Sequence, residues 1–167
     1  MTPETVYLSL GSNLGDREDN LRQAVALLAG AGLESIRISS VYETAPRDLE
    51  DQPVFLNLAV EARSAFPPEL LLARIRAIED RLGRQRTQPK GPRTLDIDIL
   101  LYGEHAVDLP HLEIPHPRMA ERRFVLEPLA ELAPGLKHPT LNLPVADLLR
   151  TLPPQGVRRA GPLEAKP

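Results

Sequence analysis

An apolar stretch at residues 95–102 constrains the fold most, because it has the composition of a buried strand and yet carries two carboxylates, Asp96 and Asp98. Side chains of a strand alternate between the faces of a sheet, so both carboxylates point to one face and Leu95, Ile97 and Ile99 to the other. Two like charges on a sheet repel each other and lose hydration, so the pair needs a cation, a shared proton or a basic partner. A divalent metal ion is the simplest such partner. The pair could instead face solvent on the polar side of a half-covered sheet.

The segment before this stretch is rich in cations. Arg84, Arg86, Lys90 and Arg93 lie in or beside residues 88–92, which two prolines and a glycine break into a loop. A cationic loop that leads into an acidic strand favours a site that binds a metal ion together with phosphate groups.

The composition limits the class of protein. A chain of 167 residues fits one domain, which we place at residues 1–152, and the Pro- and Gly-rich residues 153–167 are expected to form a flexible tail. A net charge of -3 does not favour binding to nucleic acid or to a membrane surface, and the lack of cysteine excludes disulfides and zinc-thiolate sites. No secretion signal precedes the first strand, and no apolar run approaches the roughly 18 residues of a membrane span. We therefore expect a soluble, cytoplasmic protein, by default a monomer.

The hydrophobic periodicity predicts six elements before residue 103. They are strands at residues 5–10, 33–42, 55–63 and 95–102 and helices from residue 16 to about 30 and from residue 67 to about 83. The order strand-helix-strand-strand-helix-strand is typical of the ferredoxin-like βαββαβ fold, an α+β fold with an antiparallel sheet and both helices on one face. Further helices around residues 123–132 and 145–152 are expected to cover the other face and give an α/β/α three-layer arrangement.

Asn57 stands out inside the third strand. A buried amide costs free energy unless its donors and acceptors are matched, so either a core network or a ligand must satisfy it. Phe55 shares its face, and an aromatic ring beside an amide suits a flat heterocycle, although for the ring taken alone a core position is the more common explanation. The turn at residues 11–16 lacks the Lys and Ser/Thr of a P-loop, so a tight strand-to-helix turn explains it best.

A second basic cluster follows the acidic strand. His116, Arg118 and Arg122 could join the loop cations and hold a triphosphate opposite a carboxylate-bound metal ion. The other histidines, His105 and His138 among them, lie near loops and prolines without ligand-like spacing, and we expect them at the surface.

Five blocks of sequence together resemble the 6-hydroxymethyl-7,8-dihydropterin pyrophosphokinase family. They run in the family's order and spacing from residue 7 to residue 134: YLSLGSNLGD at residues 7–16, SVYET at 40–44, DQPVFLN at 51–57, GPRTLDIDIL at 91–100, and PHPR at 115–118 continuing to FVL at 124–126. One departure is Lys90, which stands where many members have an aromatic residue, and it leaves the contacts of this loop least defined.

The resemblance implies an activity and a set of site residues. Members transfer the terminal diphosphate of ATP, with two magnesium ions, to the hydroxymethyl group of 6-hydroxymethyl-7,8-dihydropterin and release AMP. By position, the expected metal ligands are Asp96 and Asp98. The expected catalytic residues are Arg84, Arg93, Asp96 and Asp98. The expected pterin contacts are Thr44, Pro46, Phe55, Asn57, Asp96 and Phe124. The expected ATP contacts are Glu79, Arg84, Arg86, Arg93, Ile99, His116, Arg118 and Arg122.

Two other functions remain compatible with the acidic strand and the fold alone. A nucleotidyl transferase with two metal ions would attack the α-phosphate and release pyrophosphate instead of AMP. A small ligand-binding module of the same fold would bind a heterocycle without consuming ATP. Neither explains the ordered blocks.

Overall fold

A computed structural model describes residues 2–45, 54–83 and 94–164 of the chain. Its elements, in chain order, are β1 (Glu4–Ser12), α1 (Arg17–Gly30), β2 (Glu34–Ile38), β3 (Val41–Thr44), β4 (Phe55–Ser64), α2 (Pro68–Arg81), β5 (Asp96–Tyr102), β6 (Val107–Leu109), β7 (Leu112–Ile114), the 3-10 helix η1 (Met119–Glu121), α3 (Arg123–Leu132), α4 (Val145–Arg150) and β8 (Val157–Gly161). The predicted helices and strands are all present.

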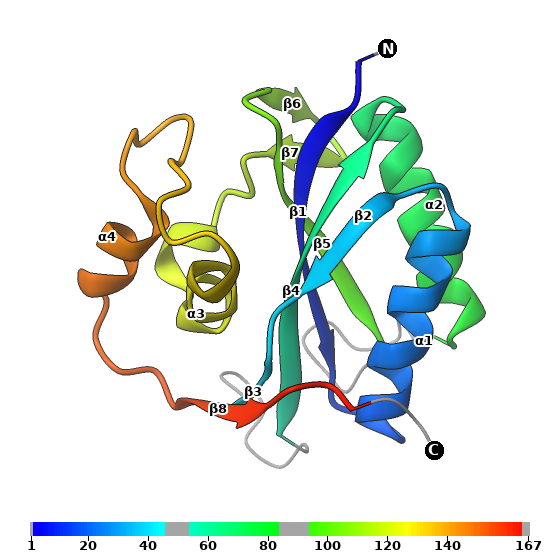
Figure 1. Cartoon of the computed structure of the whole chain (residues 1–167), viewed down its shortest axis with the longest axis horizontal. Coiled ribbons are helices and arrows are strands. Elements are labelled where there is room, and N and C mark those ends of the chain that lie inside the picture. The colour runs from blue at the N-terminus through cyan, green and yellow to red at the C-terminus, as the bar shows by residue number, and fades with distance from the viewer. Residues whose placement is uncertain (1, 46–53, 84–93, 165–167) are drawn as a thin grey trace.

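The main sheet has the order β5-β1-β4-β3-β8, with β2 also paired to β4, and every pairing is antiparallel. This confirms the predicted ferredoxin-like arrangement. Helices α1 and α2 cover one face of the sheet, and α3 lies on the other with α4 outside it (Figure 1). The predicted three layers are therefore confirmed, and the sheet separates two cores.

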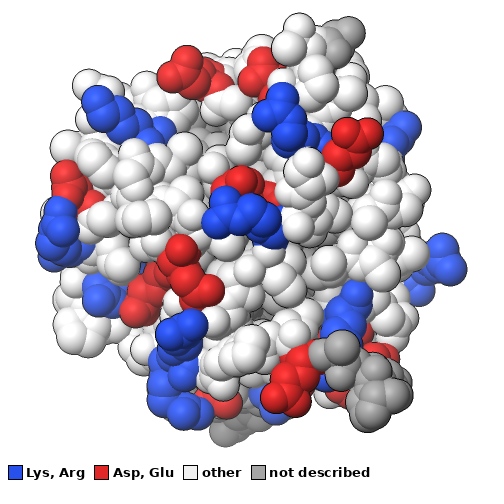
Figure 2. Space-filling view, viewed as in Figure 1, with Lys and Arg blue, Asp and Glu red and all other residues white. Residues whose placement is uncertain are grey.

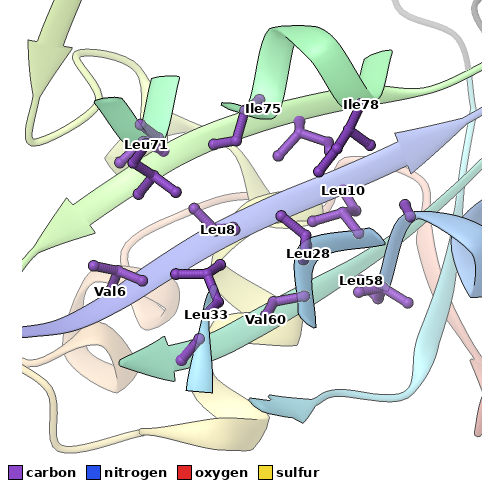
Figure 3. Close-up of a cluster of buried hydrophobic side chains, with 14 of the residues drawn as sticks. Val6, Leu8, Leu10, Leu28, Leu33, Leu58, Val60, Leu71, Ile75 and Ile78 are labelled. Carbon is purple, nitrogen blue, oxygen red and sulfur yellow. The ribbon is translucent and has the colours of Figure 1, made fainter. Parts of the chain in front are cut away.

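The core under α1 and α2 is almost entirely aliphatic (Figure 3). Leu8 and Leu58 of the sheet pack there with Leu71 and Ile75 of α2, and each of the four is at most 1% exposed. Burying one such side chain contributes about 1.5–3 kcal/mol, so this face stabilises the domain. Leu70, an apolar residue of the same helix, is 41% exposed, because it is offset by one residue from Leu71 and faces away.

The core on the other face joins the sheet to α3 and α4. Ala59 of β4 and Leu100 of β5 pack there with Leu126 and Leu129 of α3. Both faces of the central strands are therefore covered along part of their length. This explains why β4 is a nearly continuous buried run instead of an alternating one.

The predicted single strand at residues 33–42 is divided into β2 and β3 by a bulge. Ile38 pairs with Val60 and Tyr42 with Asn57, so four steps on this side match three on β4. Ser39 bridges the break, because its backbone N–H donates to Ala59 O at 3.0 Å and its Oγ accepts from Ala59 N at 2.9 Å. One extra residue reverses the alternation of side chains beyond it.

The chain beyond residue 103 differs from the sequence expectation in three places. The short connection after β5 is a hairpin of β6 and β7. His138, expected at the surface, is 6% exposed, and its Nδ1 accepts hydrogen bonds from Thr140 N and Leu141 N. The prediction of an unstructured tail is wrong for β8, which pairs with β3. The Arg-rich sequence of β8 has no apolar pattern that would predict a strand. Its pairing depends on the backbone groups of β3, which would otherwise form an open edge of the sheet.

None of the helices in the described ranges is long and apolar enough to cross a membrane.

Candidate active site

A row of residues crosses the sheet on the face that carries α3. Asp96 on β5 is opposite Gly11 on β1, Gly11 is opposite Asn57 on β4, and Asn57 is opposite Tyr42 on β3. Asp98 lies in the next row, opposite Ser9. The antiparallel register thus brings residues from four distant segments onto one side of the sheet.

The two carboxylates share one face, as their spacing predicts. Leu95, Ile97 and Ile99 are at most 5% exposed and pack in the core under α1 and α2. Asp96 and Asp98 alternate with them, so they point to the opposite face, where both are half-buried. Ile99, an expected ATP contact, therefore has its side chain on the far side of the sheet, and only its backbone could reach a nucleotide.

Asn57 is held in a defined orientation by its neighbours. It is 4% exposed, and its Nδ2 donates to Thr44 Oγ1 at 2.9 Å. Its amide oxygen lies over Gly11, where a Cβ would come within 2.8 Å of Asn57 Oδ1 and 3.7 Å of Phe55 Cδ1. A side chain at position 11 would therefore displace the amide. The structure brings together Thr44, Phe55 and Asn57, three of the expected pterin contacts.

The beginning of α3 places an aromatic ring next to a cation. Phe124 is half-buried, and the guanidinium carbon of Arg122 lies 5.5 Å from the centroid of its ring. A cation in this position is attracted to the ring face by about 0.5–1 kcal/mol. Arg122 and Phe124, an expected ATP contact and an expected pterin contact, are thus neighbours in space.

His116 connects the second basic cluster to the acidic strand. Its backbone N–H donates to Leu100 O of β5 at 2.9 Å. Burial, together with the positive charges of Arg122 and Arg118, lowers the pKa of His116 to about 4, and the negative charge of Asp96 opposes this shift. His116 therefore lies within electrostatic range of both arginines and of Asp96.

The imidazole of His116 is neutral at physiological pH. Its Nδ1 accepts a hydrogen bond from Arg118 N at 3.2 Å, which assigns the proton of the neutral ring to Nε2. The side chain can therefore donate a hydrogen bond to an anionic ligand without adding a positive charge. Figure 2 shows positive and negative side chains interspersed over one face of the molecule, without a continuous patch of either charge.

Glu79, an expected ATP contact, has a structural contact that its sequence position did not predict. It is 2% exposed, and its Oε2 accepts a hydrogen bond from Ile97 N at 2.9 Å. Because β5 is an edge strand, this N–H would otherwise lack a partner in the sheet. Glu79 thereby fixes α2 to the strand that carries the two aspartates.

The remaining predicted site residues lie outside the described residues. They are Pro46, Arg84, Arg86 and Arg93, and their expected roles stay predictions.

Sequence reasoning missed the contribution of Glu131. Its Oε1 accepts a hydrogen bond from Tyr42 Oη at 2.8 Å, and its Oε2 accepts one from Ser40 N at 2.8 Å. Burial and this carboxylate raise the pKa of Tyr42 above its ordinary value. An unbroken strand over residues 33–42 would have Tyr42 on the same face as Ile38, and the bulge between β2 and β3 reverses that. The seven-residue spacing from Phe124, two helical turns, was the signal that places Glu131 on the same side of α3.

The donor set at the acidic pair fits magnesium. No group of three or more His, Cys, Asp or Glu side chains that could enclose a metal ion occurs within residues 2–45, 54–83 and 94–164. Mg²⁺ is usually held by only one or two carboxylates and completes its shell with water and substrate phosphates. Two neighbouring aspartates on an open strand therefore suit an ion that arrives with a nucleotide.

Comparisons with known proteins agree on one family. The family model described as 7,8-dihydro-6-hydroxymethylpterin-pyrophosphokinase (HPPK) matches residues 7–134. The chain is 52% identical over 127 residues to 2-amino-4-hydroxy-6-hydroxymethyldihydropteridine pyrophosphokinase of Bacillus subtilis (strain 168), covering 75% of this chain and 76% of that one. It is 39% identical over 143 residues to the protein of the same name from Aquifex aeolicus (strain VF5), covering 86% and 89%.

Longer relatives contain the matched region as a part. The chain is 41% identical over 143 residues to the folic acid synthesis protein fol1 of Pneumocystis carinii, with 86% of this chain and only 19% of that protein covered. Among solved structures, wild-type HPPK-DHPS of Plasmodium falciparum with pteroate gives a TM-score of 0.73 at 17% identity, covering 90% of this chain and 42% of that chain. At this identity the likeness supports the fold alone.

Proposed function

The chain belongs to the 7,8-dihydro-6-hydroxymethylpterin-pyrophosphokinase family, and from this premise we propose that it transfers diphosphate from ATP to 6-hydroxymethyl-7,8-dihydropterin in folate biosynthesis. The oxygen of the pterin hydroxymethyl group attacks the β-phosphorus, the bond from that phosphorus to the α–β bridging oxygen breaks, and AMP leaves. The hydroxyl proton passes to solvent. The products are AMP and the pterin diphosphate.

The observation that carries this proposal is the row formed by Asp96, Gly11 and Asn57. It sets a carboxylate beside an oriented amide on one face of the sheet, with a glycine between them over which the amide oxygen lies. A flat heterocycle bound at Asn57 would hold its substituent close to the carboxylates. This juxtaposition suits phosphoryl-group transfer to a heterocycle's side chain.

The pterin side of the site is formed by two aromatic rings and a polar pair. We assign Phe55 and Phe124 to stacking on the bicycle, and Asn57 to hydrogen bonding with its edge. The bond from Asn57 Nδ2 to Thr44 Oγ1 fixes the amide orientation before the ligand arrives. An amide that is already ordered loses little entropy on binding, which favours affinity.

The nucleotide side is formed by the cations around β5. The neutral imidazole of His116 donates from Nε2 to a phosphate oxygen, and Arg118 and Arg122 offset the negative charge of the triphosphate. Arg84 and Arg93, outside the described residues, are proposed to stabilise the charge that develops on the bridging oxygen. The transferred group is already electrophilic, so positioning and electrostatics contribute more than a strong base.

We assign the binding of two magnesium ions to Asp96 and Asp98. When bound, these ions would offset the charge of the phosphate groups and lower the pKa of the attacking hydroxyl group. The two aspartates hold and orient them, and Glu79 keeps the strand in place through Ile97 N. A monomeric state and a cytoplasmic location stay predictions.

One incubation tests the proposal. The protein is mixed with ATP, Mg²⁺ and 6-hydroxymethyl-7,8-dihydropterin, and the nucleotide products are separated by chromatography. AMP that forms only when all three are present is the expected result. Release of pyrophosphate would indicate nucleotidyl transfer instead, and binding of the pterin without any consumption of ATP would indicate a ligand-binding module.

A further inference from the structure

The C-terminal strap, defined as residues 155–161, lies outside residues 7–134 that match the family model. It contacts two elements of the candidate site, β3 and the beginning of α3. Its strand β8 pairs with β3 so that Val157 is opposite Thr44. At the end of β3, Ala45 N donates to Gly156 O at 3.4 Å. Gly156 has a φ of +69°, a conformation that glycine adopts without strain, and turns the chain onto β3. The strap therefore holds the strand whose Thr44 orients Asn57.

The same strap caps the beginning of α3. The first N–H groups of a helix lack the usual partner one turn earlier, and the side chain at the N-cap position, Arg122, has no acceptor atom with which to cap them. Gln155 supplies the acceptor, because its Oε1 accepts from Arg123 N at 2.9 Å and its Nε2 donates to Glu121 O at 3.0 Å. Phe124 is the next residue of this first turn. A side chain from the strap thus stabilises the helical turn that presents the second aromatic ring.

Arg159 joins the strap to both β3 and α3. Its guanidinium donates to Ser40 Oγ at 2.9 and 3.2 Å and lies 3.6 Å from Glu131 Oε1. The same Glu131 oxygen accepts from Tyr42 Oη. An exposed ion pair alone contributes little to stability. Here, however, β3 and β8 both contact the carboxylate of Glu131 on α3, so a shift of one element is transmitted to the other two.

We propose that the C-terminal strap positions the two walls of the pterin site relative to each other, with Gln155 and Arg159 as its positioning residues. One wall is β3, which carries Thr44, and the other is the first turn of α3, which carries Phe124. This inference rests on the proposed function. A purely structural role for the strap would lower the melting temperature without selecting one substrate over the other.

The test compares four purified full-length variants by steady-state kinetics, with AMP formation as the readout. Gln155→Ala and Arg159→Ala each raise the KM for the pterin about fivefold, since a helix cap affects its first turn by about this factor. The KM for ATP and kcat change less than about twofold, because all the expected ATP contacts except Arg122 lie on segments other than β3 and the beginning of α3. Thr151→Val, which removes a hydrogen bond to Leu148 O at 2.7 Å at the end of α4, just before the strap, is the first control and leaves both KM values unchanged. Arg158→Ala, which removes the exposed pair with Glu43 from the same strand, is the second control.

A conservative variant separates positioning from folding. Gln155→Glu keeps an acceptor for Arg123 N and restores the pterin KM to within about twofold of the wild-type value. Arg159→Ala carries the test if Gln155→Ala does not fold. An unchanged pterin KM in the folded variants, or an equal rise in both KM values, overturns the role of the strap. A wild-type protein that forms no AMP overturns the proposed function itself, and this inference with it.

Discussion

The two faces of the central sheet have different roles: one forms the aliphatic core and the other carries the candidate site. Under α1 and α2 the side chains are aliphatic, as at Leu58, which is fully buried. One residue earlier, Asn57 faces α3 and belongs to the row that leads to Asp96. Because strand neighbours point in opposite directions, a residue chosen for stability and a residue chosen for chemistry can be adjacent in sequence and independent in space. Substitutions on the two faces should therefore have different consequences.

The largest effect is expected for the acidic pair. Asp98→Asn keeps the size of the side chain but removes its charge, so we expect the domain to fold and kcat to fall by two orders of magnitude or more, about the scale of lost charge stabilisation at a metal site. Turnover at saturating ATP and Mg²⁺ measures the loss, and thermal unfolding verifies the fold. A variant with more than a tenth of wild-type turnover would contradict the assignment of this carboxylate to the metal site.

The opposite face should show the reverse pattern. Ile75 of α2 is fully buried, and Ile75→Ala leaves a cavity, so we expect a loss of about 2–5 kcal/mol in the free energy of unfolding. The kcat of the remaining folded protein should change less than about twofold, because Ile75 is across the sheet from the aspartates. Urea denaturation gives the first quantity. If kcat fell as far as in Asp98→Asn, the two faces would not be independent.

A smaller and more selective effect is expected at Gly11. Gly11→Ala places a Cβ within 2.8 Å of Asn57 Oδ1, so the amide must move and the KM for the pterin should rise about tenfold, which corresponds to about 1.4 kcal/mol. The KM for ATP should stay within about twofold. The matched control is Gly30→Ala at the end of α1, where a Cβ meets nothing within 4 Å and the change should stabilise the protein by about 0.4–1 kcal/mol. Equal kinetics in the two variants would remove Asn57 from the pterin site.

The sequence predicted the face under α1 and α2 more completely than the other face. Apolar periodicity is a local signal. It located α1, α2 and their strands because apolar residues there alternate in the strands and recur every three or four residues in the helices. The spacing of Asp96 and Asp98 was equally local. Their common face followed from strand geometry without any knowledge of the fold.

The site face depends on events that a periodic pattern does not record. A single bulge before β3 turned Tyr42 toward Glu131, and the backbone pairing of β8 left no apolar signature. The contact of Gln155 with Arg123 N spans 32 residues. Such contacts come from tertiary placement, so the resemblance could name candidate site residues, while the groups that hold them could not be predicted from the sequence.

The last expected effect is on the pH dependence of stability, and it concerns His116 on the site face. His116 has its pKa lowered from 6.5 to about 4 in the folded protein, so between these pH values the unfolded chain binds more protons than the folded one. The free energy of unfolding therefore falls as the pH is lowered from 6.5 toward 4, and below about 4 both states are protonated and this contribution no longer changes. His116→Gln removes it. The stability of the wild type relative to this variant should decline by about 1–2 kcal/mol over that window, after allowance for solvent screening. Urea midpoints measured at pH 7 and pH 5 for wild type, His116→Gln and the exposed control His111→Gln test this, and parallel curves for all three would show that His116 is not buried among the site cations.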